Sequence, residues 1–200
     1  MDILAHTLWA GIGIAMLRRR RPMSPPGRPK GEFRSAQHEG TPITAPVAAA
    51  TVALAALPDV AHLLPILAWW ALGSGNWAAV LAYAVALPGQ EPSLPPTVLM
   101  LSHHGHCILH SAVVAAVVSL LVWGLRRAWW LPLLGWWSHI VIDVFTHSAD
   151  YYAVPVLYPF TERGFDGIAW NQPWMLVLNY AAITAAAAWL WRSRRAASRP

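Results

Sequence analysis

The stretch GWWSHIVIDVFTHSADYY, residues 135–152, combines a strongly apolar sequence with three ionisable side chains at four-residue steps. His139, Asp143 and His147 share one face of an α-helix, because 3.6 residues complete a turn. An apolar core packs more easily without such groups, so the stripe predicts a metal ion, a proton-transfer role or other polar partners. We expect His147, one turn beyond Asp143, at the mouth of a cavity rather than on the same ion as His139.

The composition around this stretch is that of a multi-span membrane protein. Of the 200 residues, 56% are hydrophobic and only 12% are charged, whereas roughly a quarter of the residues in soluble domains are charged. The mean hydropathy is +0.41. A single cysteine, Cys107, excludes an internal disulfide and a Cys-based zinc cluster. We therefore predict an all-α fold, a polytopic membrane helical bundle.

Thirteen of the fourteen Lys and Arg residues lie in three short stretches, each beside an apolar segment. These stretches are residues 18–34, 126–127 and 192–199. Such clustering is typical of cytoplasmic loops under the positive-inside rule, and the predicted partners are membrane lipids with anionic headgroups. The positive charge therefore indicates no nucleic-acid partner, since no basic face is interleaved with aromatic residues.

The apolar segments predict about five transmembrane helices and one outer excursion. The crossings fall roughly at 3–17, 43–64, 107–125, 129–147 and 173–191. Residues 65–102 indicate an outer hairpin or re-entrant excursion, because the apolar run 77–87 is too short to cross a bilayer. Residues 1–191 then form one transmembrane domain with a cytoplasmic loop at 18–42, followed by a cytoplasmic basic tail at 192–200. The N-terminus lies outside and the C-terminus in the cytoplasm.

Ionisable side chains on four of these crossings fall at about the same predicted depth. At about 1.5 Å per helical residue, His6, Asp59, His110, His139 and Asp143 lie roughly 15–25 Å from the cytoplasmic boundary, in the outer half of a core about 30 Å thick. Ionisable groups inside a bilayer usually face a cavity, a partner or an ion. Imidazole and carboxylate ligands suit zinc, manganese or iron, so these residues predict a divalent metal site.

Local motifs add less information about the reaction. HCILH puts His106 and His110 on one helical face, and HIVID does the same for His139 and Asp143. The sequence contains no HExxH zinc-protease pattern, no glycine-rich phosphate loop and no GxSxG elbow. These spacings are compatible with a metal site but do not identify a reaction.

Four short blocks occur in a characteristic order over about residues 1–160. They are MDILAHTLWA at 1–10, ALPDVAH at 56–62, HHGHCILHS at 103–111 and GWWSHIVIDVFTH…VLYPF at 135–160. In order and spacing they resemble the YdjM-like, inner-membrane-associated, metal-dependent hydrolases. The resemblance implies a multi-pass protein of the bacterial inner (cytoplasmic) membrane with hydrolase activity and a divalent metal cofactor, zinc or manganese.

The resemblance also assigns roles residue by residue. The metal ligands it implies are His6, Asp59, His110, His139 and Asp143, completed by His104 or His106 where the family has a His-Arg pair. The catalytic candidates are Asp59, His110 and Asp143. The second aspartate of the family's Pro-Asp-x-Asp motif is Ala61 here. Loss of that carboxylate indicates a single ion or a changed metal preference.

The leading hypothesis is a membrane-embedded metal-dependent hydrolase acting on an amphiphilic or lipid-linked ester or phosphoester, with residues 65–102 as a lid. The alternative is a non-enzymatic membrane protein that binds or transports metal ions or protons. A third interpretation is a structural metal site. Transport needs polar groups along a path to both faces, and residues 112–125 and 176–191 offer few, chiefly Ser119, Asn179 and Thr184. This asymmetry favours a one-sided site.

Overall fold

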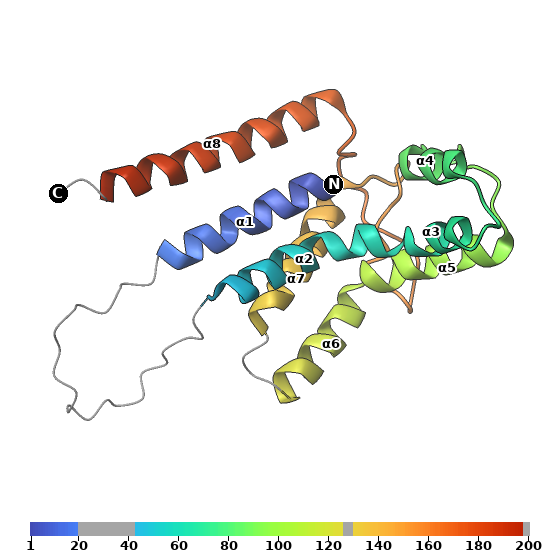
Figure 1. The fold of residues 1–200 in the computed structure, drawn as a ribbon, viewed down its shortest axis with the longest axis horizontal. Coiled ribbons are helices and arrows are strands. Elements are labelled where there is room, and N and C mark those ends of the chain that lie inside the picture. The colour runs from blue at the N-terminus through green and yellow to red at the C-terminus, as the bar shows by residue number, and fades with distance from the viewer. Residues whose placement is uncertain (20–42, 126–129, 198–200) are drawn as a thin grey trace.

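The structure, a computed structural model, describes residues 1–19, 43–125 and 130–197, which contain eight helices and no strand (Figure 1). The all-α prediction is therefore confirmed over these residues. The helices are α1 (Ile3–Arg19), α2 (Ala45–Ala61), α3 (Leu64–Ala71), α4 (Trp77–Val85), α5 (Pro96–Leu109), α6 (Ala112–Leu125), α7 (Trp130–Thr146) and α8 (Pro173–Ala197).

Among the described residues, α8 is long and apolar enough to cross a membrane alone. The pairs α2–α3 and α5–α6 reach that length only together, across bends of 65° and 63°. Helices α1 and α7 have 17 residues each, about 26 Å of helix. The described helices thus support one crossing, or up to three if each bent pair counts as one, and the five predicted crossings are not confirmed.

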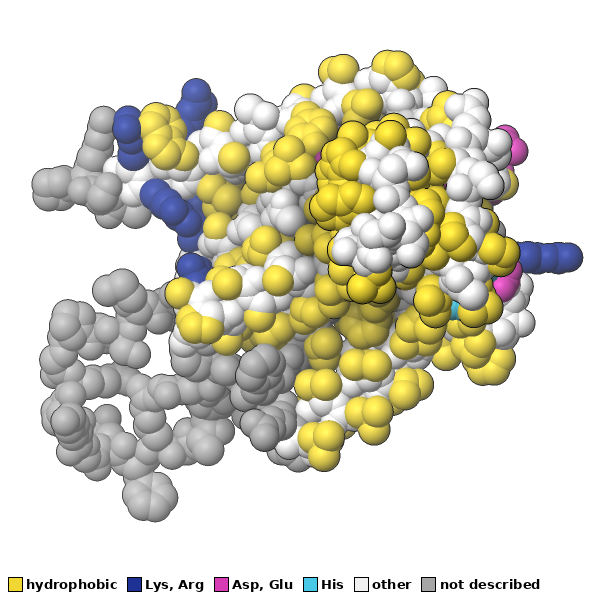
Figure 2. All heavy atoms as spheres, turned by 45° about the vertical axis from the view of Figure 1, so that its right-hand side comes forward, with side chains coloured by type: hydrophobic (Ala, Val, Ile, Leu, Met, Phe, Trp, Pro, Cys, Tyr) yellow, Lys and Arg dark blue, Asp and Glu magenta, His cyan; other side chains and the backbone are white. Residues whose placement is uncertain are grey.

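The ends of α1 and α8 and the start of α2 meet at one end of the molecule (Figure 1). The guanidinium of Arg19 lies 5.0 Å from the ring centre of Trp189 on α8. Arg18 donates a hydrogen bond of 3.1 Å to the carbonyl of Thr44, the residue that caps α2. Figure 2 shows most of the Lys and Arg side chains that it colours gathered at this end, beside a flank covered by hydrophobic side chains, and one projecting from the opposite side.

Helices α2 and α7 run parallel, and residues one turn apart on α7 contact residues one turn apart on α2. Gly135 lies against Thr51 so closely that a Cβ atom on the glycine would stand 1.9 Å from the Thr51 carbonyl oxygen. One turn later, Nδ1 of His139 lies 2.7 Å from the carbonyl oxygen of Ala55. Because Gly135 has no side chain, the two backbones approach closely enough for this bond to form. This alignment brings the last turns of α2 and α7 side by side at the candidate site.

Large hydrophobic side chains are exposed on the outward faces of α6 and α8. They include Val117, Leu120, Leu121 and Trp123 on α6, and Val177, Leu178, Trp189 and Trp191 on α8. Only 17% of the most apolar part of α8 is buried. A helix that stays apolar outside its packing face suits a lipid environment. The folded chain therefore presents a surface fitted to a membrane.

The sequence predicts one continuous helix over residues 107–125, and this prediction is wrong. The chain breaks between α5 and α6 at His110 and Ser111. The Ser111 hydroxyl accepts the backbone N–H of Val114 at 3.2 Å and donates to the carbonyl of Tyr158 at 2.5 Å. An N-cap satisfies backbone groups that a continuous helix would pair internally. Hydrophobic periodicity does not reveal a break made by a partner so distant in the sequence.

Other predicted segments are only partly described. Residues 20–42 of the predicted loop, the pair 126–127 and the last residues, 198–200, lie outside the described ranges. The predicted tail begins inside α8, which continues to Ala197. The predicted excursion contains α3, α4 and the start of α5, packed around Ile66, Val80, Leu94 and Val98.

Candidate metal centre

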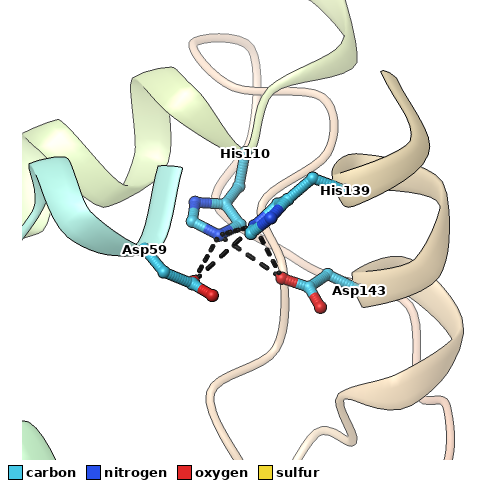
Figure 3. A group of neighbouring side chains, drawn as sticks. All are labelled: Asp59, His110, His139 and Asp143. Carbon is cyan, nitrogen blue, oxygen red and sulfur yellow. Dashed lines mark hydrogen bonds and ion pairs between the residues drawn. The ribbon is translucent and has the colours of Figure 1, made fainter. Parts of the chain in front are cut away.

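Four side chains from three parts of the chain converge near the ends of α2, α5 and α7 (Figure 3). They are Asp59 on α2, His110 after α5, and His139 and Asp143 on α7. One ligand atom from each lies within 4.8 Å of the others. The side chain of Asp59 is 15% exposed, whereas the other three are fully buried. We call these residues the four-ligand group.

The spacing of the four-ligand group suits one ion. Nε2 of His139 lies 3.1 Å from Oδ2 of Asp143 and 3.6 Å from Oδ1 of Asp59. Nε2 of His110 lies 3.4 and 3.6 Å from the same two oxygens, and the two Nε2 atoms are 3.0 Å apart. Tetrahedral zinc, with ligands at about 2.0–2.2 Å, separates its ligand atoms by roughly 3.3–3.6 Å. The side chains are thus already close to that arrangement.

Backbone carbonyls decide which nitrogen each imidazole presents to the centre. Nδ1 of His139 lies 2.7 Å from the carbonyl oxygen of Ala55, and Nδ1 of His110 lies 2.9 Å from that of His106. A carbonyl oxygen only accepts, so each Nδ1 carries a hydrogen and each neutral ring turns its Nε2 lone pair inward. The two Nε2 atoms are 3.0 Å apart, so their lone pairs repel each other unless a proton or a metal ion lies between them. A histidine that binds a metal ion usually donates its other ring N–H to a carbonyl or carboxylate in this way.

The buried carboxylate of Asp143 also lacks ordinary partners on one side. Its Oδ2 is buried and accepts no hydrogen bond, although two imidazole nitrogens lie within 3.4 Å. A buried carboxylate oxygen that receives no hydrogen bond is unfavourable. Two imidazoles and two carboxylates form a ligand set that suits zinc or manganese. The residues therefore fit a divalent ion.

The other oxygen of Asp143, Oδ1, faces a different set of groups. Nε2 of His6 lies 3.0 Å away, and Nε2 of His147 lies 3.6 Å away. The amino group of Met1 contacts Oδ1 and lies 3.1 Å from Nε2 of His147. The ring of His6 stacks on that of His139, with centroids 3.8 Å apart. His147 is only 8% exposed, so the prediction of a place at an open cavity mouth is wrong.

The structure brings His6 and the four-ligand group together, whereas it separates the two candidates for the remaining position. His104 is exposed, and its Nδ1 lies 3.2 Å from the Tyr158 hydroxyl. His106 stacks on His110 with ring centroids 4.0 Å apart, and its backbone carbonyl holds Nδ1 of His110. His104 therefore lies apart from the group, and His106 adjoins it through its ring and carbonyl.

Sequence reasoning did not find a second group, formed by His103, Cys107 and Glu162. Nε2 of His103 lies 3.6 Å from the Cys107 sulfur and 3.5 Å from the Glu162 carboxylate. The His103 and Glu162 side chains are 54% and 61% exposed. Solvent can satisfy exposed groups of this kind, so the buried four-ligand group is the stronger candidate for a metal site.

Sequence comparison matches the chain to a known family. The family model described as YdjM inner membrane protein matches residues 1–199. No curated protein and no solved structure matches the chain. The matched region includes every member of the four-ligand group, together with His6 and His147.

Proposed function

Because the chain belongs to the YdjM inner membrane protein family, we propose that it is a membrane-embedded, metal-dependent hydrolase. The observation that carries this proposal is the convergence of two buried imidazoles and two carboxylates at spacings suited to one divalent ion. Hydrolysis itself is supported by the resemblance of the sequence blocks to metal-dependent hydrolases. Asp59, His110, His139 and Asp143 are the proposed ligands.

A divalent ion held there supplies Lewis-acid polarisation of an ester or phosphoryl oxygen and lowers the pKa of water. His110 and His139 bind through Nε2, because their Nδ1 atoms are held by carbonyls. Asp59 is the one member of the group whose side chain is partly exposed, at 15%. Its Oδ2, turned away from the imidazoles in Figure 3, is the atom we propose to accept the proton of the attacking water.

An amphiphilic or lipid-linked ester or phosphoester is the substrate class we propose. The exposed apolar faces of α6 and α8 support access from the bilayer. In the loop after α7, the Tyr152 hydroxyl donates to Glu91 at 2.7 Å and lies 3.3 Å from the carbonyl oxygen of Ala86. These contacts tie residues 86–91, which follow α4 within the predicted excursion, to the loop that follows α7. The excursion is therefore positioned to act as a lid.

The distribution of buried ionisable groups favours a one-sided reaction centre over conduction. Apart from the thiol of Cys107, the buried ionisable side chains of the described residues are His6, His110, His139, Asp143 and His147, and the four imidazoles lie around Asp143. The remaining buried polar side chains of the described residues are hydroxyls and one amide. A transport path needs polar groups toward the other face as well.

Metal removal tests the proposed function. We expect purified protein in mild detergent to hold at least one zinc or manganese ion per chain. Dialysis against a chelator should reduce hydrolysis of fluorogenic phospholipid ester and phosphoester probes to background, and added Zn²⁺ or Mn²⁺ should restore it. Protein that binds no divalent ion contradicts the metal centre. Protein that binds the ion but cleaves neither probe favours the non-enzymatic alternative.

We further propose the five-crossing topology, with the C-terminal end of α1 in the cytoplasm. It is supported by the contacts of Arg18 with Thr44 and of Arg19 with Trp189, which join three helix ends. Reporter fusions after Lys30, Arg127 and Arg199 should all give a cytoplasmic signal, because positive stretches stay inside. A periplasmic signal from any one of the three contradicts this topology.

A further inference from the structure

We propose that a second divalent cation binds beside the first, held by His6, His147 and Oδ1 of Asp143. Asp143 then bridges two ions, with Oδ2 on the four-ligand group and Oδ1 on the second position. The inference goes beyond the proposed hydrolase centre and rests on it, because Asp143 belongs to both. Three observations carry it: the position of His6, the support of His147 and the charge already present between His147 and Asp143.

His6 faces Oδ1 of Asp143, whereas His110 faces Oδ2. Its Nε2 lies 3.0 Å from Oδ1, and its side chain is fully buried. Its other ring nitrogen, Nδ1, is also buried and has no hydrogen-bond partner. Stacking on His139 at a centroid distance of 3.8 Å fixes the plane of the ring. A buried imidazole in this position has one strong partner, the carboxylate oxygen that faces away from the first ion.

His147 is held by its backbone surroundings in the same way as the histidines of the four-ligand group. Its Nδ1 lies 2.9 Å from the carbonyl oxygen of Tyr152, so Nδ1 carries the hydrogen and Nε2 turns a lone pair toward Oδ1, 3.6 Å away. The His147 carbonyl accepts the N–H of Gly167 at 2.9 Å. A Cβ atom on Gly167 would lie 2.7 Å from that carbonyl oxygen, so only glycine fits here without a shift.

The loop that supplies the Tyr152 carbonyl adopts an uncommon conformation. Tyr152 has a φ of 49°, a left-handed backbone that aromatic residues rarely adopt and that often marks functional sites. Its hydroxyl donates to Glu91, and this hydrogen bond lowers the pKa of the Glu91 carboxyl. The tether keeps the Tyr152 carbonyl directed at His147. The left-handed backbone of Tyr152 is unfavourable by itself. It nevertheless orients the imidazole of His147, which is not a member of the four-ligand group.

A positive charge already lies at the second position. The amino group of Met1 contacts Oδ1 of Asp143 and stands 3.1 Å from Nε2 of His147. The amino group fills the space between these two atoms, so a metal ion that binds there takes the place of this ammonium. If a metal ion binds there, the pair of ions would resemble two-metal centres about 3.5–4 Å apart, which act on phosphoryl groups. The inference thus favours phosphoesters over carboxylic esters as substrates.

Metal stoichiometry tests the second position. Full-length protein, His147→Ala and the control His104→Ala are purified in mild detergent, loaded with Mn²⁺ and freed of excess ion. We expect two ions per chain in the unmodified protein and in His104→Ala, whose imidazole is exposed and apart from the group. His147→Ala should retain one ion. His147→Gln, which keeps a polar side chain of similar length, should also retain one.

Electron paramagnetic resonance of the Mn²⁺-loaded unmodified protein gives a reading that does not depend on any variant folding. We expect the spectrum of a magnetically coupled pair, replaced in His147→Ala by that of an isolated ion. One uncoupled ion per chain in the unmodified protein overturns the second position while leaving the proposed hydrolase centre intact. No bound ion contradicts both proposals.

Discussion

Asp143→Asn is expected to lose bound metal almost completely, because both oxygens of this buried carboxylate face imidazole nitrogens. Oδ2 lies 3.1 Å from Nε2 of His139, and Oδ1 lies 3.0 Å from Nε2 of His6. An asparagine keeps the shape but has no negative charge and only one acceptor oxygen. Since altering a partner behind the ligands already weakens metal binding by about 10–100-fold, removing a ligand should exceed that loss. Hydrolysis should fall to background with the metal.

Metal analysis of purified variants measures this effect. The matched control is Asp150→Asn, which neutralises an exposed aspartate seven residues away in the sequence. The control should keep the metal content and activity of the unmodified protein. If Asp143→Asn retains its metal while Asp150→Asn loses it, the proposed centre is in the wrong place.

The pairing of His139 with Asp143 follows from sequence because it depends on local geometry alone. Four-residue spacing in a helix puts both side chains on one face, and charge positions along the apolar segments predict that His6, Asp59 and His110 lie at a similar level. The structure brings all five together. Their role as ligands stays a prediction, and so does the depth of the site in the bilayer.

Contacts between distant segments explain what the sequence pattern does not reveal. The break after Leu109 depends on the Trp136 indole, which donates to the Leu109 carbonyl at 2.6 Å, and on the bond from Ser111 to Tyr158. The burial of His147 depends on the left-handed backbone of Tyr152. Apolar periodicity carries no information about such partners. From the sequence alone, a histidine near a helix end such as His147 is therefore easily taken for a side chain at the membrane–water interface.

Gly135→Ala tests the packing that delivers His139 to the site, and we expect a large loss of stability. A Cβ atom at Gly135 would lie 1.9 Å from the Thr51 carbonyl oxygen and 3.1 Å from the Ala55 backbone nitrogen. These neighbours are helix backbone, which cannot turn aside as a side chain can. Overpacking of this kind should lower the free energy of unfolding by about 3 kcal/mol, outweighing the gain of about 1 kcal/mol that alanine brings to a helix.

The same substitution should weaken metal binding without touching a ligand. Moving α7 away from α2 stretches the 2.7 Å bond from Nδ1 of His139 to the Ala55 carbonyl, which orients Nε2 toward the ion. Loss of such a partner typically weakens metal binding by about 10–100-fold. Thermal unfolding followed by tryptophan fluorescence, together with metal titration, measures both effects. Gly13→Ala in α1 is the control, since nothing lies within 4 Å of a Cβ atom there. If both variants unfold alike and bind metal alike, α2 and α7 do not pack as closely as Gly135 implies, and His139 must be oriented by something other than the Ala55 carbonyl.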